Sequence, residues 1–203
     1  MKLIGNYTSP FVRKITIMLM EKGILFEFVN ENPWLESSQM ADYNPLGKVP
    51  ALAVSENEVW YDSPIIASWL ELQDKPPFFV PKAPMAALRI RQLEALADGL
   101  CEAALMIVRE QLRAPEKQCE SLLTRQRKKI HQGLDELEQA AAKGEELNGE
   151  QINLADIACG CMLGYLNFRH ISPDWCVNRP ALVKLAEKLF QRDSFARTRP
   201  PAP

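Results

Sequence analysis

The chain has 203 residues, of which 47% are hydrophobic and 25% charged, with a formal net charge of -2 at pH 7. These proportions are typical of a globular protein that can bury a core. The small negative charge gives no general attraction to nucleic acid or to anionic membranes. No apolar run approaches the roughly 18 residues of a membrane-spanning helix, and the N-terminus is interrupted too early for a signal peptide. We therefore expect a cytoplasmic protein.

The cysteines and histidines give little support for a disulfide framework or a metal centre. The five cysteines are odd in number, and no secretion signal precedes them. Cys159 and Cys161 lie two residues apart in an apolar stretch, where they would point to different sides of a helix. The two histidines, His131 and His170, lack paired cysteines at the spacing of structural zinc sites. We expect no metal.

The first part of the chain alternates short apolar runs with helical patterns. The expected elements are strands over 2–6, 25–29, 49–54 and 58–61, helices over 10–21 and from Ser63, and an irregular or loosely helical connection over 32–43. Gly23 would end the first helix. The first two strands and the helix between them predict a parallel βαβ unit, and the later strands predict a hairpin.

Four prolines among residues 73–84 predict an irregular connection. We place a linker over 74–84, between an N-terminal domain over 1–73 and an all-helical domain over 85–203. Helical periodicity in the second domain predicts helices over 85–111, 120–142, 152–168 and 180–191, followed by an extended tail from Arg197. Gly99, inside the first of these helices, is expected to mark a bend or a close approach.

Ser9 stands at a strand-to-helix turn, immediately before Pro10. A serine at the start of a helix most often caps it. The same place presents free backbone N–H groups and the positive end of the helix dipole, which favour an anion such as a thiolate. Both roles remain open for the residue taken alone. A Ser-His-Asp triad has little support, because the chain has no G-x-S-x-G motif.

Two further dipeptides precede regular elements. If the Val49–Pro50 bond is cis, the Val49 amide would be turned outward and free to pair with a peptide-like ligand. Asp62 and Ser63 precede a helix, where capping is the ordinary role. The alternative is that Asp62 holds an ammonium group and Ser63 a carboxylate, which together belong to an α-amino acid.

These patterns resemble the glutathione transferase family along essentially the whole chain. The segments that carry the resemblance are SPFVRK at 9–14, NPLGKVPAL at 44–52, DSPIIASWL at 62–70, INLADIA at 152–158 and RDSFART at 192–198. Within INLADIA, Asn153 and Asp156 match the family's capping box. Asp193 replaces a proline of the usual bacterial C-terminal motif, and Asp62 replaces the more frequent glutamate. With serine at position 9, the chain resembles the serine-type members of the family.

The resemblance implies an α/β thioredoxin-like domain (βαβ-ββα) followed by an all-α domain. It also implies that glutathione is a substrate and that the protein is a homodimer. Carried over by position, Ser9 would donate a hydrogen bond to the glutathione sulfur. The residues that would bind the rest of the tripeptide are Val49 and Pro50 (cysteinyl unit), Asp62 and Ser63 (γ-glutamyl end), and Lys48 or Gln39 (glycyl carboxylate). The residues that would line a second-substrate cleft are Phe11, Met106, Arg109 and Tyr165.

Core packing is the alternative for Met106 and Tyr165, because apolar residues at helical spacing usually form the core. Arg109 either favours an anionic electrophile or pairs with nearby Glu102 or Glu110. The implied function is a glutathione S-transferase that activates the thiolate through Ser9 and conjugates or reduces a small electrophile. The alternatives are a glutathione-dependent peroxidase or isomerase, and a non-catalytic binding module of the same fold. A glutaredoxin-like reductase would need cysteine at position 9.

Overall fold

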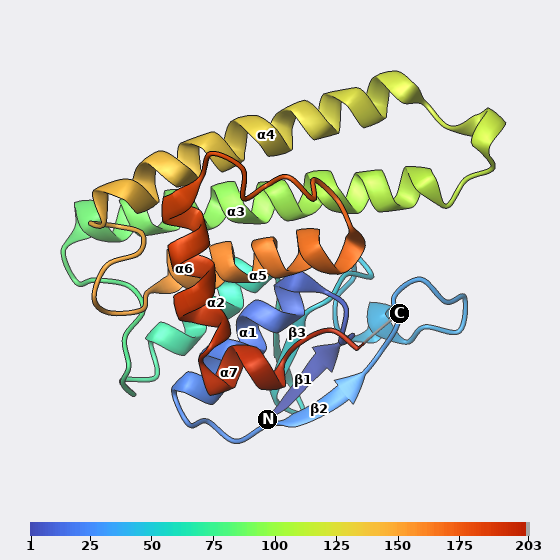
Figure 1. Cartoon of the computed structure of the whole chain (residues 1–203). Coiled ribbons are helices and arrows are strands. Elements are labelled where there is room, and N and C mark those ends of the chain that lie inside the picture. The colour runs from blue at the N-terminus through green and yellow to red at the C-terminus, as the bar shows by residue number, and fades with distance from the viewer. Residues whose placement is uncertain (202–203) are drawn as a thin grey trace. The chain divides into compact units, whose positions relative to one another are not determined.

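The computed structural model describes residues 1–201 and divides the chain into two compact units (Figure 1). The first unit comprises Met1–Phe79 together with the chain from Gln191 onward. The second unit comprises Val80–Phe190. Within the described residues, no helix is both long and apolar enough to cross a membrane.

The first unit is built on a four-stranded sheet with the strand order β2-β1-β3-β4. Its strands are β1 (Lys2–Gly5), β2 (Glu27–Asn30), β3 (Ala51–Ser55) and β4 (Glu58–Trp60). β1 pairs in parallel with β2 and antiparallel with β3, and β3 and β4 form a hairpin. The predicted βαβ unit and hairpin are therefore confirmed.

Two helices of the first unit contact each other beside this sheet: α1 (Pro10–Glu21) and α2 (Ser63–Glu71) (Figure 1). A short 3-10 helix, η1 (Met40–Asp42), lies in the connection that was expected to be irregular or loosely helical. Apolar residues at helical spacing drive α1 into the core, where Ile15 and Met18 are completely buried. The strand and helix pattern of residues 1–71 thus follows the sequence closely.

The proline-rich connection after α2 is irregular, as its composition predicted, but it is firmly held. The Lys22 ammonium, whose side chain is completely buried, donates hydrogen bonds to the carbonyl oxygens of Lys75 and Pro77 and pairs with Glu71 at 3.1 Å. The same ammonium lies 5.2 Å from the ring centroid of Phe79. A buried charge needs such partners to offset its lost hydration, so Lys22 fixes the connection to the end of α1.

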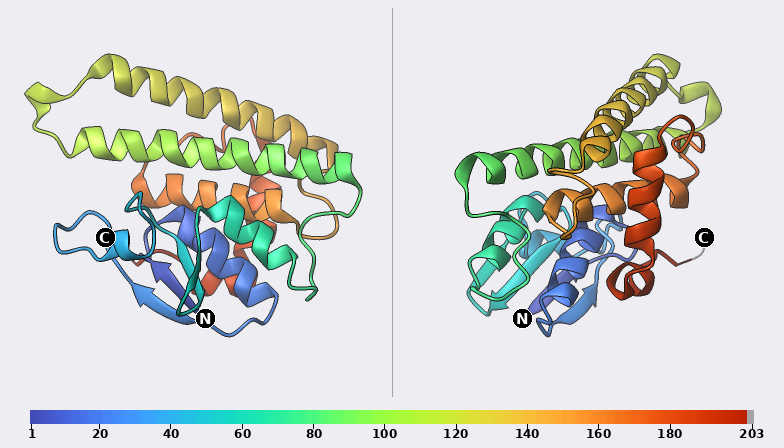
Figure 2. Two further views of the ribbon diagram at one scale, coloured as in Figure 1. Left: turned by 180° about the vertical axis from the view of Figure 1, so that it is seen from behind. Right: turned by 60° about the vertical axis from the view of Figure 1, so that its left-hand side comes forward.

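The second unit is entirely helical in its regular structure (Figure 2). Its long helices are α3 (Pro84–Gln111), α4 (Glu120–Lys143), α5 (Leu154–Arg169) and α6 (Pro180–Phe190), with a 3-10 turn, η2 (Pro115–Lys117), between α3 and α4. α3 contacts both α4 and α5, and α6 contacts α4 and α5. The almost wholly apolar α5 is therefore enclosed, as expected from its sequence.

The predicted capping box at the start of α5 is confirmed. The Asp156 backbone N–H donates to Asn153 Oδ1, and the Asn153 N–H donates to Asp156 Oδ2, both at 3.0 Å. Asp156 Oδ1 also accepts the N–H of Asn148 at 2.8 Å. The carboxylate thus binds the preceding loop as well as the helix start.

The C-terminal segment differs from the expectation that residues 85–203 form one helical domain. A short helix that the sequence analysis missed, α7 (Asp193–Arg197), belongs to the first unit and contacts α1 (Figure 1). The predicted extended tail has no regular structure over 198–201, and its last two residues lie outside the described chain.

The physical reason for this difference is that the C-terminal segment supplies ion-pair and hydrogen-bond partners to charged side chains of α1. Arg192 pairs with Glu21 at 2.7 Å, and the Ser194 hydroxyl donates to the same carboxylate. The guanidinium of the buried Arg13 donates to the carbonyl oxygen of Phe195 at 2.9 Å. The hydrogen bond from Arg192 is the main reason why the pKa of Glu21 lies below its usual value.

Two glycines of the helical unit bear on the close approach that was expected at Gly99. Gly99 is exposed in the unbroken α3, and a Cβ atom placed there would meet nothing within 4 Å. The expected close approach at Gly99 is therefore wrong. It occurs instead at Gly133 of α4, where a Cβ atom would lie 2.5 Å from the Leu100 side chain of α3.

The two glycines therefore predict opposite effects of the same substitution. Gly99→Ala should raise the free energy of unfolding by up to about 1 kcal/mol, because alanine restricts the unfolded chain and favours helix. Gly133→Ala should lower it by about 1–3 kcal/mol, because the added methyl group pushes into Leu100. Urea unfolding followed by circular dichroism measures both. Equal changes in the two variants would contradict the packing described here.

Candidate functional site

One end of the sheet brings together three chain junctions. β3 runs antiparallel to β1 with Ile4 opposite Ala51, so the end of β1 lies beside the start of β3. β4 runs antiparallel to β3 with Trp60 opposite Leu52, so the end of β4 lies at the same place. The residues that follow β1, precede β3 and follow β4 are therefore neighbours, and they include Ser9, Val49 and Asp62.

Ser9 caps α1, as its position suggested. Its backbone is extended (φ -77, ψ 125), and its hydroxyl oxygen accepts the N–H of Val12 at 3.3 Å. Capping uses the oxygen only as an acceptor. The hydroxyl proton has no acceptor among residues 1–201, so Ser9 can cap its helix and donate to a ligand at the same time.

The Val49–Pro50 peptide bond is cis, the state that the sequence alone could not establish. Val49 is half-buried, and neither its N–H nor its C=O has a hydrogen-bond partner in the described part of the chain. Unpaired backbone groups next to a strand can bind an extended peptide segment. The Tyr61–Asp62 bond, at the neighbouring junction, is also cis.

Asp62 and Ser63 have different roles at the start of α2. Asp62 is the N-cap and accepts the Ser63 N–H, whereas Ser63 is the first residue of the helix. Of the two residues for which capping was the ordinary role, only Asp62 therefore caps the helix. The Ser63 side chain is buried, and its hydroxyl has no hydrogen-bond partner within residues 1–201. A buried polar group without a partner is uncommon in proteins and points to a ligand that supplies one.

The residues expected at the glycyl end are exposed. Gln39 precedes η1 and makes no side-chain cap, although its backbone N–H donates to Glu31. Lys48 lies one residue before Val49, and its side chain forms no ion pair with any described residue. Both side chains are therefore available to a ligand.

The residues expected in a second-substrate cleft come from three helices. Phe11 is a half-buried residue of α1, and Met106 and Arg109 are exposed residues of α3. Met106 is 42% exposed, so core packing does not explain it. Tyr165 of α5 is buried, as the core interpretation expected, and burial raises the pKa of its hydroxyl.

Comparison with known proteins decides the family. The family described as "Glutathione S-transferase, N-terminal domain" matches residues 8–73, and "Glutathione S-transferase, C-terminal domain" matches residues 120–185. The chain belongs to the glutathione S-transferase family. The fold class implied by the resemblance is thereby confirmed, with the sheet in one unit and the long helices in the other.

Similar proteins cover this glutathione S-transferase chain from end to end. The uncharacterized GST-like protein YibF of Escherichia coli (strain K12) is 55% identical over 99% of both chains. A glutathione S-transferase from Methylobacterium radiotolerans, solved in complex with glutathione sulfonate, is 37% identical with a TM-score of 0.91, over 100% of this chain and 95% of the other. One from Methylobacillus flagellatus, with glutathione bound, is 34% identical with a TM-score of 0.92, over 98% and 99%.

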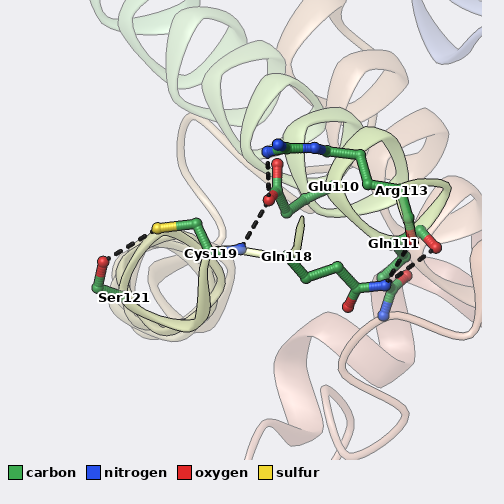
Figure 3. Close-up of polar contacts among 6 residues, drawn as sticks. All are labelled: Glu110, Gln111, Arg113, Gln118, Cys119 and Ser121. Atoms are coloured by element: carbon green, nitrogen blue, oxygen red, sulfur yellow. Dashed lines mark hydrogen bonds and ion pairs between the residues drawn. The ribbon is translucent and has the colours of Figure 1, made fainter. Parts of the chain in front are cut away.

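The cysteines include one group that the sequence analysis did not single out. Among residues 1–201, no cluster of metal-binding side chains is found, and none of the five cysteines forms a disulfide bond. Cys119 is exposed at the start of α4, with Sγ 3.2 Å from Ser121 Oγ (Figure 3). This hydrogen bond, helped by the Leu122 backbone, lowers the pKa of the thiol. The available signal was its position two residues before Ser121, at the start of a helical pattern.

A hydrogen bond from its backbone N–H holds Cys119 in place. Its N–H donates to Glu110 Oε1 at 2.7 Å, and Arg113 pairs with the same oxygen at 2.9 Å (Figure 3). The Cys119 N–H is the main cause of the lowered pKa of Glu110. The buried Cys159 is the opposite case, because desolvation raises the pKa of its thiol far above the usual value.

We predict that Ser121→Ala slows alkylation of Cys119 by iodoacetamide at neutral pH by about two- to tenfold. The reason is that a higher pKa leaves less of the reactive thiolate. Peptide mass spectrometry after timed quenching gives the rate at each cysteine. Cys176, which is also exposed, provides the internal control and should react at the same rate in both proteins. Unchanged alkylation of Cys119 would exclude Ser121 as the cause.

Proposed function

We propose that this chain binds glutathione at the junction end of its sheet and presents the glutathione thiolate to a small electrophile. The observation that carries the proposal is the Ser63 hydroxyl, which is buried without a partner at the start of α2. Beside it stands the exposed carboxylate of Asp62. A carboxylate acceptor and an ammonium donor on one ligand satisfy both residues, and the γ-glutamyl end of glutathione carries this pair.

The neighbouring junctions support the same ligand. The unpaired backbone of Val49, beside Pro50, suits the cysteinyl unit, because an extended peptide pairs with free N–H and C=O groups. Lys48 or Gln39 suits the glycyl carboxylate, as both are exposed. Relatives solved with glutathione or glutathione sulfonate cover the chain at 34–37% identity, which supports the assignment of the ligand.

The proposed role of Ser9 is to stabilise the thiolate, with the nucleophilic atom supplied by glutathione. A free thiol has a pKa of about 8.5, so only a few per cent is ionised at neutral pH. A pKa lower by about two units requires about 2.7 kcal/mol of preference for the anion. A hydrogen bond to a charged group contributes about 1.5–3 kcal/mol, and the N-terminus of α1 adds to it. Ser9 therefore needs no histidine to remove its proton.

The remaining parts of the proposal concern the electrophile and the assembly. Met106 and Arg109, which are both exposed on α3, are the candidate contacts of the second substrate, with Arg109 favouring an anionic one. The reaction is conjugation, with reduction, peroxide reduction and isomerisation as further uses of the same thiolate. A cytoplasmic homodimer is the proposed state of the protein, in line with the family.

Ser63→Ala should weaken glutathione binding by about 10- to 100-fold, because a charge-assisted hydrogen bond is lost. The same change should leave the free energy of unfolding equal or slightly higher, because it removes a buried hydroxyl that has no partner. Titration calorimetry and urea unfolding measure the two effects. Ser68→Ala is the control on the same helix, since that hydroxyl already donates to Pro64. Wild-type protein that fails to bind millimolar glutathione would refute the proposed function and leave a non-catalytic module.

Ser9→Ala should change the bound thiol more than it changes binding. We expect affinity within about threefold of wild type and a bound-thiol pKa higher by about one to two units, because the anion alone loses its donor. Ultraviolet absorbance of the thiolate, titrated against pH with saturating glutathione, measures this. Thr8→Val is the matched control, because the Thr8 hydroxyl is already engaged with Asn6. A titration indistinguishable from wild type would remove Ser9 from the mechanism.

A further inference from the structure

The first unit contains a cavity whose lining does not include the proposed glutathione residues. It has a volume of about 190 Å³ and is bounded by the turn between β1 and α1, by α1, by β2 with the residue before it, and by the end of α7 with the two residues that follow. Its lining includes none of Ser9, Val49, Asp62 and Ser63. The cavity therefore requires its own explanation.

One side of this cavity is aromatic and apolar. Tyr7 and Phe28 stack with ring centroids 4.6 Å apart and an interplanar angle of 24°. Phe26, Val12 and Met20 continue the apolar lining. Tyr7 remains 57% exposed, so the stacked pair presents open ring surface to whatever enters. Such a surface favours a planar apolar group, because aromatic rings gain from stacked contact as well as from burial.

The other side of the cavity is positively charged. Arg13, Arg197 and Arg199 line it, and no aspartate or glutamate does. Arg13 is already committed, since it donates to the Phe195 carbonyl and to Thr198 Oγ1. These two hydrogen bonds hold the segment that carries Arg197 and Arg199 against α1.

The other two arginines, Arg197 and Arg199, are the ones available to a ligand. Arg197 pairs with Asp193 at 3.2 Å, but both side chains are more than two-thirds exposed, so water weakens that pair. Arg199 is exposed and forms no ion pair with any residue in the range 1–201. The cavity lining thus includes Arg199, a guanidinium without a carboxylate partner in the described chain, together with aromatic rings.

We propose that this cavity binds a small aromatic carboxylate, with its ring on the Tyr7–Phe28 pair and its carboxylate at Arg199. The size agrees, because a cavity of about 150 Å³ accepts benzene and the additional volume accommodates a carboxylate. The chemistry agrees as well, since a guanidinium matches a carboxylate with two parallel hydrogen bonds. An inorganic anion would leave the rings unused, and a neutral aromatic molecule would leave the charge unused.

The test uses 4-fluorobenzoate as the probe and follows the broadening of its fluorine NMR signal on addition of the full-length protein. We expect a dissociation constant of the order of 1 mM, as suits a ligand of this size. Arg199→Gln should weaken binding at least about fivefold, and Thr16→Phe, which fills the cavity from α1, should abolish it. Arg125→Gln on the exposed face of α4 is the matched control and should bind as wild type does. Circular dichroism checks that each variant is folded.

Three results would overturn the proposal. The first is equal binding of 4-fluorobenzyl alcohol, which lacks the carboxylate. The second is unchanged binding by a folded Arg199→Gln protein. The third is displacement of the probe by glutathione, or its loss in Ser63→Ala, because either would assign the probe to the glutathione residues. Binding that survives glutathione, at a concentration that calorimetry shows to saturate the protein, supports a separate site. If glutathione does not bind at all, binding of the probe by Ser63→Ala and its loss in Arg199→Gln still test the cavity independently of the proposed function.

Discussion

The antiparallel pairing of β1 with β3 is the constraint on which the candidate site depends. Because Ile4 lies opposite Ala51, the chain enters β3 at the same end of the sheet where it leaves β1. The hairpin then returns the chain to that end at Trp60. If β3 were parallel to β1, Val49 would lie at the opposite end of the sheet from Ser9. A peptide ligand can therefore meet three junctions at once only through this mixed order.

The junction end also holds hydrogen-bonding capacity that the fold itself leaves unused. The Ser63 hydroxyl and the Val49 backbone groups have no partners within the described chain. Such groups cost about 1–3 kcal/mol each when they are buried. The buried Lys22 is the contrasting case, since its ammonium is fully engaged by the connection after α2. The chain itself thus satisfies the buried charge of Lys22, whereas the Ser63 hydroxyl is left open at the junction where a ligand is expected.

The sequence predicted the local elements well because their signals are local. The cap at Ser9, the box at Asn153 and Asp156, and the strand pattern of the first unit each depend on residues close in the chain. The errors at Gly99 and in the C-terminal segment concern distant contacts. Gly99 and Gly133 look alike in sequence, and only the packing of α4 on α3 distinguishes them. At the site, Asp62 and Ser63 pointed to an α-amino acid and the family resemblance implied glutathione, whereas the unpartnered Ser63 hydroxyl required the surroundings to be known.

The return of the C-terminal segment to the first unit has a consequence for how the protein is made. The chain leaves that unit after Phe79 and rejoins it at Gln191, so the helical unit is inserted between two parts of one structure. During synthesis the N-terminal part emerges from the ribosome first. Arg13 and Glu21 therefore lack their partners Phe195 and Arg192 until the entire helical unit has emerged. The first unit to be translated is therefore the last to be completed.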